Sequence, residues 1–327
     1  MSLRERIGDA PYVARYGRRA RDFHELIKDK PPPKDWLWWD YLVRGRHVIM
    51  AGQAGAGKTM LLWQLAVQIT QDRPEEFPHD LGMLLPRTLK VAIVDAEMGS
   101  EQYHERTWET GINGLVIPNR LKYIDAAGLD VLLQNDVDYL QEELDGCDIV
   151  IMDSLKALSP SAAENDNDEM TKVTRTITNL SRGLHAGIVT IHHWGKDDRY
   201  RGASSILDQC DGLLAWKKHK PDDDDGFRCL TARGRHMKLR FAKEPADRWF
   251  RQLDSGLLIP SDAPDDEPSS KWDAKIAALL PFDGTQAELA DRCGTNSGNK
   301  SWSTAYHRIA KLDGRNHHVA QREEPVL

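Results

Sequence analysis

HVIMAGQAGAGKTMLLWQLAVQIT, residues 47–70, is the stretch that decides the fold. It begins with a short apolar run, continues through a glycine-rich segment, and ends in apolar residues at helical spacing. A short apolar run bounded by glycine predicts a buried strand, and apolar side chains three and four positions apart predict a helix that packs on it. The stretch therefore predicts a strand, a tight loop and a helix in direct succession.

The loop of this unit, GQAGAGKT at 52–59, matches the pattern G-x-x-x-x-G-K-[ST] in the strand-to-helix context that the pattern requires. Backbone N–H groups of such a loop and the positive end of the helix bind phosphates, and Lys58 would neutralise the terminal oxygens. The alternative is a glycine turn followed by a surface lysine. We expect ATP to be bound here by Gly52, Gln53, Ala54, Gly55, Ala56, Gly57, Lys58, Thr59 and Met60.

Apolar strand-like runs alternate with helical patterns as far as about residue 215. Such alternation predicts an α/β fold in which helices flank a parallel sheet. FRCLTARGR at 227–235 and DRWFRQLD at 247–254 are expected to add antiparallel strands at one edge. The expected parallel strands are Val48–Ala51, Val91–Asp95, Ile149–Asp153, Ile188–His192 and Gly212–Trp216.

The composition limits the classes of protein to consider. With 327 residues, 40% hydrophobic and 29% charged, the chain has the proportions of a folded globular protein. It contains no apolar run of membrane-spanning length and no secretory signal, so we expect a cytoplasmic protein with no membrane partner. The four cysteines, at 147, 210, 229 and 293, lie too far apart for a C-x-x-C metal site. A net charge of −7 excludes a protein that coats nucleic acid over its whole surface.

Changes in composition along the chain predict four parts. Residues 1–30 form a charged arm with a weak helical pattern, and residues 31–260 form the core. SDAPDDEPSS at 261–270 has almost nothing to bury and is expected to be a linker. Residues 271–327 then form a small domain.

Helix signals in the small domain suggest its type. Thr285 and Glu288 have the spacing of a capping box, and Gly294 ends that helix. A second helix carries Trp302 and Tyr306 on the same face as Ile309, and GRNHHVAQRE at 314–323 could form a two-stranded wing. The pattern resembles a winged helix-turn-helix, which binds either DNA or a protein; both remain open.

Acids at strand ends complete the predicted chemistry. Mg²⁺ takes oxygen ligands, and Asp153 at the end of an apolar strand would join the Thr59 hydroxyl around it, unless Asp153 merely caps the following helix. Hydrolysis also needs a group that orients or deprotonates water, and we expect it on a strand next to the phosphate-loop strand. Glu97, two residues beyond Asp95, is the predicted general base; otherwise it is a surface acid.

VAIVDAEMG at 91–99 and CDIVIMDSLKALSP at 147–160 resemble the ATPase core of the RecA superfamily, and the resemblance covers roughly residues 40–245. IVTIHHWGKDDRYRGASSILDQCDGLLAW at 188–216 is most similar to the RepA-like ATPases of plasmids and phages, relatives of the DnaB-like replicative helicases. The resemblance implies a RecA-like P-loop NTPase fold, a homo-oligomer that is usually a hexameric ring, and action on DNA.

The same resemblance implies roles for residues further along the chain. His192 or His193 occupies the strand-end position that senses the γ-phosphate and relays it to the DNA-binding loop. Because adjacent strand residues point to opposite faces, one of the two can do this, and His193 is favoured. LTARGRHMK at 230–238 resembles the strand whose Lys-x-Arg pair reaches the neighbouring subunit's nucleotide. Arg233 and Arg235 stand at those places; otherwise both belong to a solvated edge. Arg233 stands where the family commonly has lysine.

Two loops lie where RecA-like motors hold single-stranded DNA. SPSAAENDNDEM at 159–170 is acidic and suits phosphate poorly, whereas WGKDDRYRGASS at 194–205 combines basic residues with a tyrosine that can stack on a base. The predicted DNA-binding residues are Lys196, Arg199, Tyr200 and Arg201. Trp36, Trp38 and Trp39 could stack a base or contact a neighbouring subunit, but packing is the commoner role of such a cluster.

Three functions follow from these patterns. The first is an ATP-hydrolysing motor on single-stranded DNA, a ring-forming replicative helicase-like ATPase of a phage or plasmid, with the C-terminal domain contacting replication or recombination proteins. The second is a recombination or repair ATPase that forms filaments on DNA. The third is a DNA-binding regulator that ATP switches with little turnover.

Overall fold

The structure is a computed structural model. It describes residues 22–28, 30–31, 33–38, 40–77, 80–81, 88–163, 166–193, 208–220, 224–233, 237–264, 271–279, 282, 285–299, 302–303 and 305–306. The chain divides into two compact units, residues 1–262 and 263–327.

The strands are β1 (Trp36–Trp38), β2 (Leu42–Val43), β3 (His47–Gly52), β4 (Val91–Asp95), β5 (Leu121–Asp125), β6 (Ile149–Asp153), β7 (Gly187–His193), β8 (Gly212–Lys218), β9 (Phe227–Thr231), β10 (Lys238–Leu239), β11 (Arg248–Gln252) and β12 (Leu258–Ser261). The α-helices are α3 (Phe23–Ile27), α4 (Lys58–Ile69), α5 (Ser100–Glu109), α6 (Gln134–Glu143), α7 (Asn167–Leu184), α9 (Lys271–Leu279) and α10 (Gln286–Arg292), and the 3₁₀ turns are Pro74–Glu76 and Asn113–Leu115.

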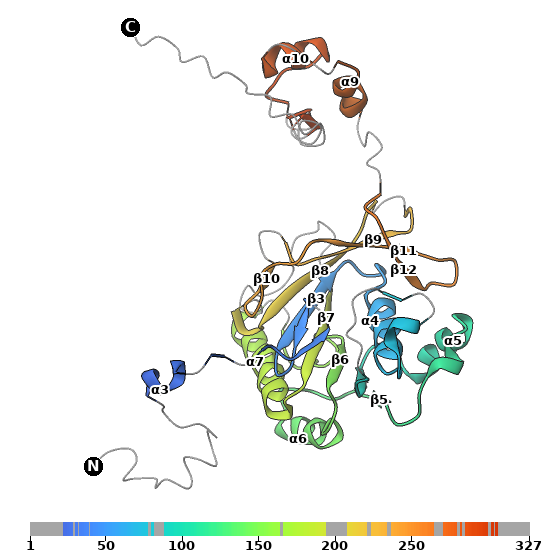
Figure 1. The fold of residues 1–327 in the computed structure, drawn as a ribbon, viewed down its shortest axis with the longest axis vertical. Coiled ribbons are helices and arrows are strands. Elements are labelled where there is room, and N and C mark those ends of the chain that lie inside the picture. The colour runs from blue at the N-terminus through green and yellow to red at the C-terminus, as the bar shows by residue number, and fades with distance from the viewer. Residues whose placement is uncertain are drawn as a thin grey trace. The chain divides into compact units, whose positions relative to one another are not determined.

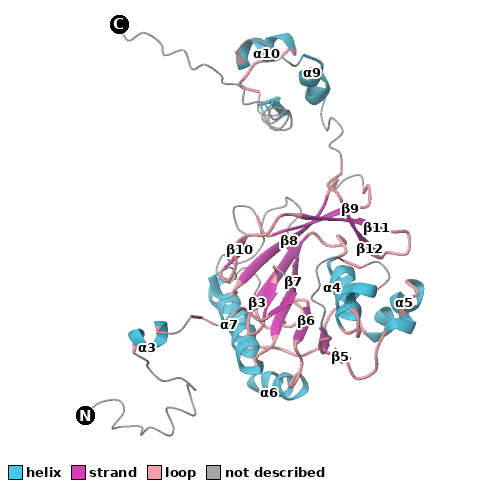
Figure 2. Ribbon diagram, in the orientation of Figure 1, coloured by secondary structure: helices cyan, strands magenta, loops and turns pink. Residues whose placement is uncertain are grey.

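One sheet organises the larger unit. Among the described residues it has ten strands, in the order β12-β11-β9-β8-β3-β7-β6-β4-β5, with β10 also paired to β8. The neighbouring strands in the stretch β8-β3-β7-β6-β4-β5 of this order pair in parallel. The pairs of β9, β10, β11 and β12 are antiparallel. Figures 1 and 2 show this sheet running through the unit with helices on its two sides, which is the α/β architecture that the alternating sequence predicts.

Alternate residues of β3 explain why both faces of the sheet are covered. Val48 and Met50 pack in one apolar cluster with α4 residues, and Ile49 and Ala51 pack in a second cluster with α6 and α7 residues. All four β3 side chains are fully buried. A strand that is apolar on both faces needs a layer on each side, as in other parallel sheets.

The sequence missed several strands at the periphery. The edge strand β5 alternates exposed and buried residues instead of forming an apolar run, and it was not expected. β10 and β12 are short, at two and four residues, and were also missed. Central strands β3, β7 and β8 each extend one or two residues beyond their predicted bounds. β12 reaches Ser261, so the first position of the predicted linker belongs to a strand.

The tryptophan segment before β3 contributes to the core. Trp38 is fully buried and packs against Tyr41, with ring centroids 5.1 Å apart. Trp36 packs edge-on against Phe241, with ring centroids 6.1 Å apart. Trp39 lies outside the described residues. Packing is therefore the observed role of Trp36 and Trp38.

The smaller unit has its own apolar cluster, which includes Trp272, Leu289 and Trp302. The capping box predicted at the start of α10 is present, because the Thr285 side chain accepts from the Glu288 N–H and the Glu288 carboxylate accepts from the Thr285 N–H. Trp302 stacks on Tyr306 with centroids 5.3 Å apart. Residue 309 and the predicted wing lie outside the described residues, as do residues 1–21 of the arm, so the winged helix-turn-helix stays a prediction.

Among the described residues, no helix combines the length and the apolar character that crossing a membrane requires.

Candidate active site

The carboxyl ends of four parallel strands meet along one edge of the sheet. β3 leads into the phosphate loop, β7 ends at His193, β6 ends at Asp153 and β4 ends at Asp95. Gly52 pairs with His193 across β3 and β7, and Asp95 pairs with Asp153 across β4 and β6. This register brings the predicted chemical groups to the same edge although they lie far apart in the sequence.

The expectation that Glu97 follows a strand next to the phosphate-loop strand is wrong. The sheet order places β7 and β6 between β3 and β4. Glu97 nevertheless contacts His193 at the end of β7, because it lies two residues beyond β4 in a turn at that edge. The contact between Glu97 and His193 therefore forms although β4 and β7 are not adjacent in the sheet.

The phosphate loop closes around the side chain of Lys58, the first residue of α4. Its Nζ donates to the carbonyl oxygens of Gly52, at 2.9 Å, and Gln53, at 2.8 Å. Gly57 precedes the helix with a φ of 89°, a conformation that suits glycine. Burial lowers the pKa of Lys58 to about 8, although Asp153 and Glu97 act in the opposite direction. The cation is thus held in a poorly solvated position beside the loop.

Thr59 and Asp153 are in direct contact. The Thr59 hydroxyl donates to an Asp153 carboxylate oxygen at 2.6 Å. Asp153 is 2% exposed, and burial raises the pKa of its carboxyl to about 6. One hydroxyl and one carboxylate at the end of a strand suit Mg²⁺, which takes oxygen ligands and usually binds through few protein groups together with phosphate oxygens and water. The donor set therefore fits the expected metal.

Glu97 is held by two side chains. Its carboxylate oxygens lie 3.3 and 3.4 Å from Nε2 of His193. The hydrogen bond from His193 is the main cause that lowers the pKa of Glu97 to about 2, and a hydrogen bond from Ser154 also contributes. The peptide bond between Asp153 and Ser154 is cis. Glu97 is therefore a carboxylate across the physiological pH range.

The two histidines at the end of β7 occupy different environments. His192 is 2% exposed, whereas the His193 side chain is 36% exposed and faces the loop. Nδ1 of His193 lies 3.3 Å from Nζ of Lys58. Because the ammonium group can only donate, Nδ1 is the acceptor, and Nε2 carries the proton that faces Glu97. His193 thus connects the phosphate-loop lysine to the predicted base.

Asp95 has a role that the sequence reasoning did not assign. One of its carboxylate oxygens accepts from the N–H groups of Glu97, at 3.1 Å, and Met98, at 3.0 Å. The other accepts from the Gly99 N–H at 2.6 Å and from the Tyr123 hydroxyl at 2.9 Å. The carboxylate thereby fixes the turn that carries Glu97. The available sequence signal is an aspartate that ends an apolar strand and has a glycine four residues later, since aspartate side chains commonly accept from backbone N–H groups in turns.

The remaining predicted site residues are not brought to this edge by described contacts. Arg233 has an exposed side chain whose Nε donates to the carbonyl of Pro245 at 2.9 Å. Arg235 lies outside the described residues. So do the four predicted DNA-binding residues, Lys196, Arg199, Tyr200 and Arg201.

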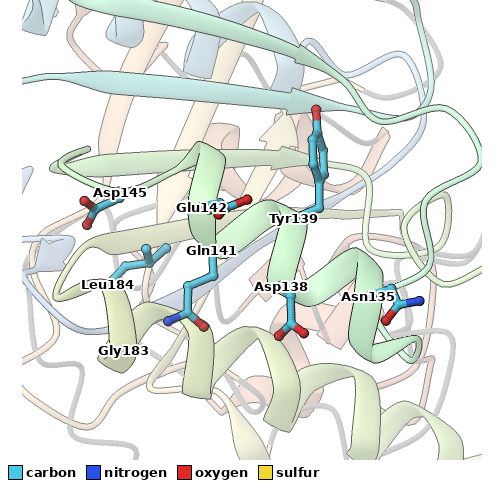
Figure 3. Close-up of a pocket in the computed structure, with 8 residues that line it drawn as sticks. All are labelled: Asn135, Asp138, Tyr139, Gln141, Glu142, Asp145, Gly183 and Leu184. Atoms are coloured by element: carbon cyan, nitrogen blue, oxygen red, sulfur yellow. The ribbon is translucent and has the colours of Figure 1, made fainter.

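A separate cavity of about 770 Å³ lies between α6 and the end of α7 (Figure 3). Because β7 begins just after α7 ends, this cavity is at the amino ends of the parallel strands, opposite the phosphate loop. Its lining is mostly polar and contains none of the residues described above. The lining residues are Asn135, Asp138, Tyr139, Gln141, Glu142, Asp145, Gly183 and Leu184.

Comparisons with known proteins agree with this geometry. Residues 14–199, more than half of the chain, match the family described as AAA domain. DNA repair protein RadA of Synechocystis sp. (strain ATCC 27184 / PCC 6803 / Kazusa) is 25% identical over 226 residues, which are 66% of this chain and 40% of RadA. The chain thus spans well under two thirds of this curated relative.

Two solved structures share the fold at low sequence identity. One, described as an ATPase domain, aligns with a TM-score of 0.51 and 14% identity, covering 67% of this chain and 86% of that domain. A DnaB-like replicative helicase, described with its interactions with primase, aligns with a TM-score of 0.53 and 14% identity, covering 80% of this chain and 67% of the helicase. The family match identifies the chain as a member of the AAA domain family, and its fold is that of a RecA-like P-loop ATPase core, similar to the fold of the DnaB-like helicase.

Proposed function

We propose that this chain is an ATP-hydrolysing motor that acts on single-stranded DNA as a ring of identical subunits, in the cytoplasm where its DNA is replicated. One arrangement carries the proposal: His193 lies between the phosphate-loop Lys58 and the carboxylate of Glu97, with Asp153 bonded to Thr59 at the same edge. A cation, a carboxylate and a histidine around a phosphate-binding loop suit hydrolysis of a terminal phosphate.

Each of these groups has a part in the proposed reaction. The loop residues 52–60 bind the phosphates through their N–H groups, and Lys58 turns its ammonium group from the loop carbonyls to the terminal oxygens. Thr59 and Asp153 would hold Mg²⁺, which supplies positive charge to the phosphate oxygens. Glu97 orients the attacking water and accepts its proton. Proper placement and charge, more than covalent chemistry, provide the catalysis in phosphoryl transfer.

His193 would exchange one partner for another during this cycle. Its Nε2–H, now directed at Glu97, can donate to a γ-phosphate oxygen instead. Loss of that hydrogen bond removes the main cause of the low pKa of Glu97 and makes the carboxylate a better base. The following segment, with Lys196, Arg199, Tyr200 and Arg201, is the proposed DNA-binding loop, so movement of His193 would couple nucleotide to DNA. Arg233 and Arg235 are the proposed trans-acting arginines.

A second function has support from one comparison. The match to DNA repair protein RadA favours a recombination or repair ATPase that forms filaments on DNA. The two functions share the nucleotide chemistry and differ in how the subunits assemble. The sequence match covers 40% of RadA, so it supports the shared ATPase part of such a protein.

ATP hydrolysis with and without a single-stranded oligonucleotide tests the proposal. A DNA-dependent rise in kcat supports a motor, whereas the same kcat at saturating DNA contradicts it and favours an ATP-switched regulator. Electron microscopy with ATP and the oligonucleotide then distinguishes the helicase-like function from the recombination or repair function by the form of the assembly. Closed rings support the helicase-like function, and helical filaments support the recombination ATPase.

A further inference from the structure

One carbonyl of the phosphate loop is held by two side chains from outside the motif. The carbonyl oxygen of Ala56 accepts from Nε1 of Trp216 at 2.8 Å and from Nε of Arg228 at 3.1 Å. Trp216 lies on β8 and Arg228 on β9. Their exposed fractions are 0% and 3%, so both donors reach the loop through the interior of the protein.

The geometry of a peptide bond gives this contact a consequence. A trans peptide unit is planar, and its C=O and N–H point in opposite directions. The Ala56 carbonyl belongs to the same unit as the N–H of Gly57, which precedes α4. Fixing the carbonyl on the side of Trp216 and Arg228 therefore directs the Gly57 N–H to the other side. A phosphate-binding loop needs its N–H groups directed into its concave face.

The loop is also fitted closely to Trp216. A Cβ atom added to Gly52 would lie 2.2 Å from the Trp216 carbonyl oxygen and 3.5 Å from a carbon of the Lys58 side chain. A Cβ atom added to Gly57 would lie 3.9 Å from Nε1 of Trp216, which is ordinary contact. Glycine at position 52 is therefore what allows β8 to lie directly against the loop.

Arg228 is itself fixed by a set of acceptors. Its Nη1 and Nη2 donate to the two carboxylate oxygens of Asp224 at 2.7 and 2.9 Å, and Nη2 also donates to Oε1 of Gln252 at 2.6 Å. Lys218 pairs with the same aspartate at 2.9 Å. A buried guanidinium is costly unless its donors are satisfied, and these partners satisfy it. Strands β8, β9 and β11 thereby hold one atom of the phosphate loop.

We propose that Trp216 and Arg228 are positioning residues for the nucleotide phosphates: they hold the Ala56 carbonyl behind the loop and so keep the Gly57 N–H directed at the bound phosphates. This inference rests on the proposed nucleotide site and extends it to two residues that lie outside the motif. Neither side chain touches the nucleotide in this account. They act through the orientation of one peptide unit.

Titration with ADP in a calorimeter tests the inference in the full chain. Arg228→Met removes the donors but keeps an unbranched side chain, and Arg251→Met on the exposed face of β11 is its matched control. Loss of one buried hydrogen bond to the loop should raise the dissociation constant for ADP about fivefold to tenfold. The stoichiometry should stay that of the wild type. An unchanged dissociation constant with reduced stoichiometry would indicate a purely structural role and would overturn the proposal.

A second variant covers the case in which Arg228→Met does not fold. Replacing Trp216 by β-(3-benzothienyl)alanine puts sulfur in place of the indole N–H and keeps the ring shape, with the same replacement at Trp249 as control. The ADP dissociation constant should again rise at unchanged stoichiometry, and the KM for ATP should rise more than kcat falls. Wild-type affinity in this variant would overturn the inference. Failure of the wild-type chain itself to bind ADP would instead refute the nucleotide site.

Discussion

Nε2 of His193 lies 3.3 Å from a carboxylate oxygen of Glu97, although the two residues are 96 positions apart in the chain. The contact joins the ends of β7 and β4, which are not adjacent in the sheet. On its other side the imidazole accepts from Lys58. A change at the phosphate loop can therefore reach the predicted base through one side chain, and this relationship gives the mutational predictions below their direction.

Glu97→Gln should abolish hydrolysis and preserve nucleotide binding. The amide keeps the size of the side chain but cannot accept the proton of a water molecule, and general-base contributions are typically about a hundredfold to ten-thousandfold. We expect kcat to fall by about that factor, with the dissociation constant for ATP unchanged within experimental error. Glu101→Gln, at an exposed position in the first turn of α5, is the matched control. Wild-type turnover in Glu97→Gln would refute the assignment.

Asp95→Asn should lower kcat with little change in KM. The asparagine NH₂ group would face a backbone N–H that now donates to the carboxylate, so the turn carrying Glu97 would shift. We expect about a tenfold loss, because small displacements of a catalytic group are costly. Steady-state ATPase kinetics measure it, with Asp125→Asn at the exposed end of β5 as control.

A double variant shows whether Asp95 acts through Glu97. If it does, Asp95→Asn should have almost no further effect on kcat once Glu97 is glutamine, since coupled residues are strongly non-additive. Independent effects that multiply would assign Asp95 a different role.

The local part of this site could be predicted from the sequence, and the part that depends on strand order could not. Residues 52–59 carry their own strand, loop and helix signals, so Lys58 and Thr59 follow from neighbouring residues alone. The contact between Glu97 and His193 depends on the order β3-β7-β6-β4, which no local pattern encodes. The support of Ala56 by Trp216 and Arg228 similarly depends on which strands pair beyond β3.

Mixed assemblies should reveal a site shared between subunits. Arg235→Ala and Glu97→Gln should each lose hydrolysis when pure, the first because it removes a trans-acting cation and the second because it removes the base. In a mixture, some boundaries pair an intact Glu97 with an intact Arg235 from the neighbour. We expect mixing to restore part of the ATPase rate. A rate no higher than that of the separate variants would favour a site built within one chain.

Nucleotide affinity should fall as the pH rises above about 8. Burial lowers the pKa of Lys58 to about 8, and bound phosphates favour its charged form, so binding above this pH requires uptake of a proton. The affinity should decrease by up to about tenfold per pH unit in that range and should be nearly constant below it. Calorimetry at pH 8.5 in two buffers of different ionisation enthalpy measures the proton uptake directly. Equal apparent enthalpies in the two buffers would contradict the prediction.

Asp153→Asn should stabilise the protein while removing the effect of Mg²⁺ on nucleotide binding. Burial raises the pKa of Asp153 from 3.8 to about 6, so the charged form is disfavoured in the folded state. A shift of about two pH units corresponds to at most about 3 kcal/mol in the free energy of unfolding. Because the folded-state pKa is the higher one, this cost is fully present above about pH 6 and disappears as the pH falls toward the unfolded value.

Urea unfolding of Asp153→Asn and wild type at pH 7.5 and pH 4.5 measures the effect, with the larger difference expected at pH 7.5. Asp148 precedes the same strand, and its carboxylate accepts from Arg44 at 2.7 Å and from the Lys90 N–H at 2.8 Å. Asp148→Asn should therefore lower the free energy of unfolding, by about 1 kcal/mol. Opposite signs for two Asp→Asn changes at the two ends of β6 would show that Asp153 is retained for its chemistry at a cost in stability. Destabilisation by both changes would contradict the stability cost assigned to the buried Asp153 carboxylate.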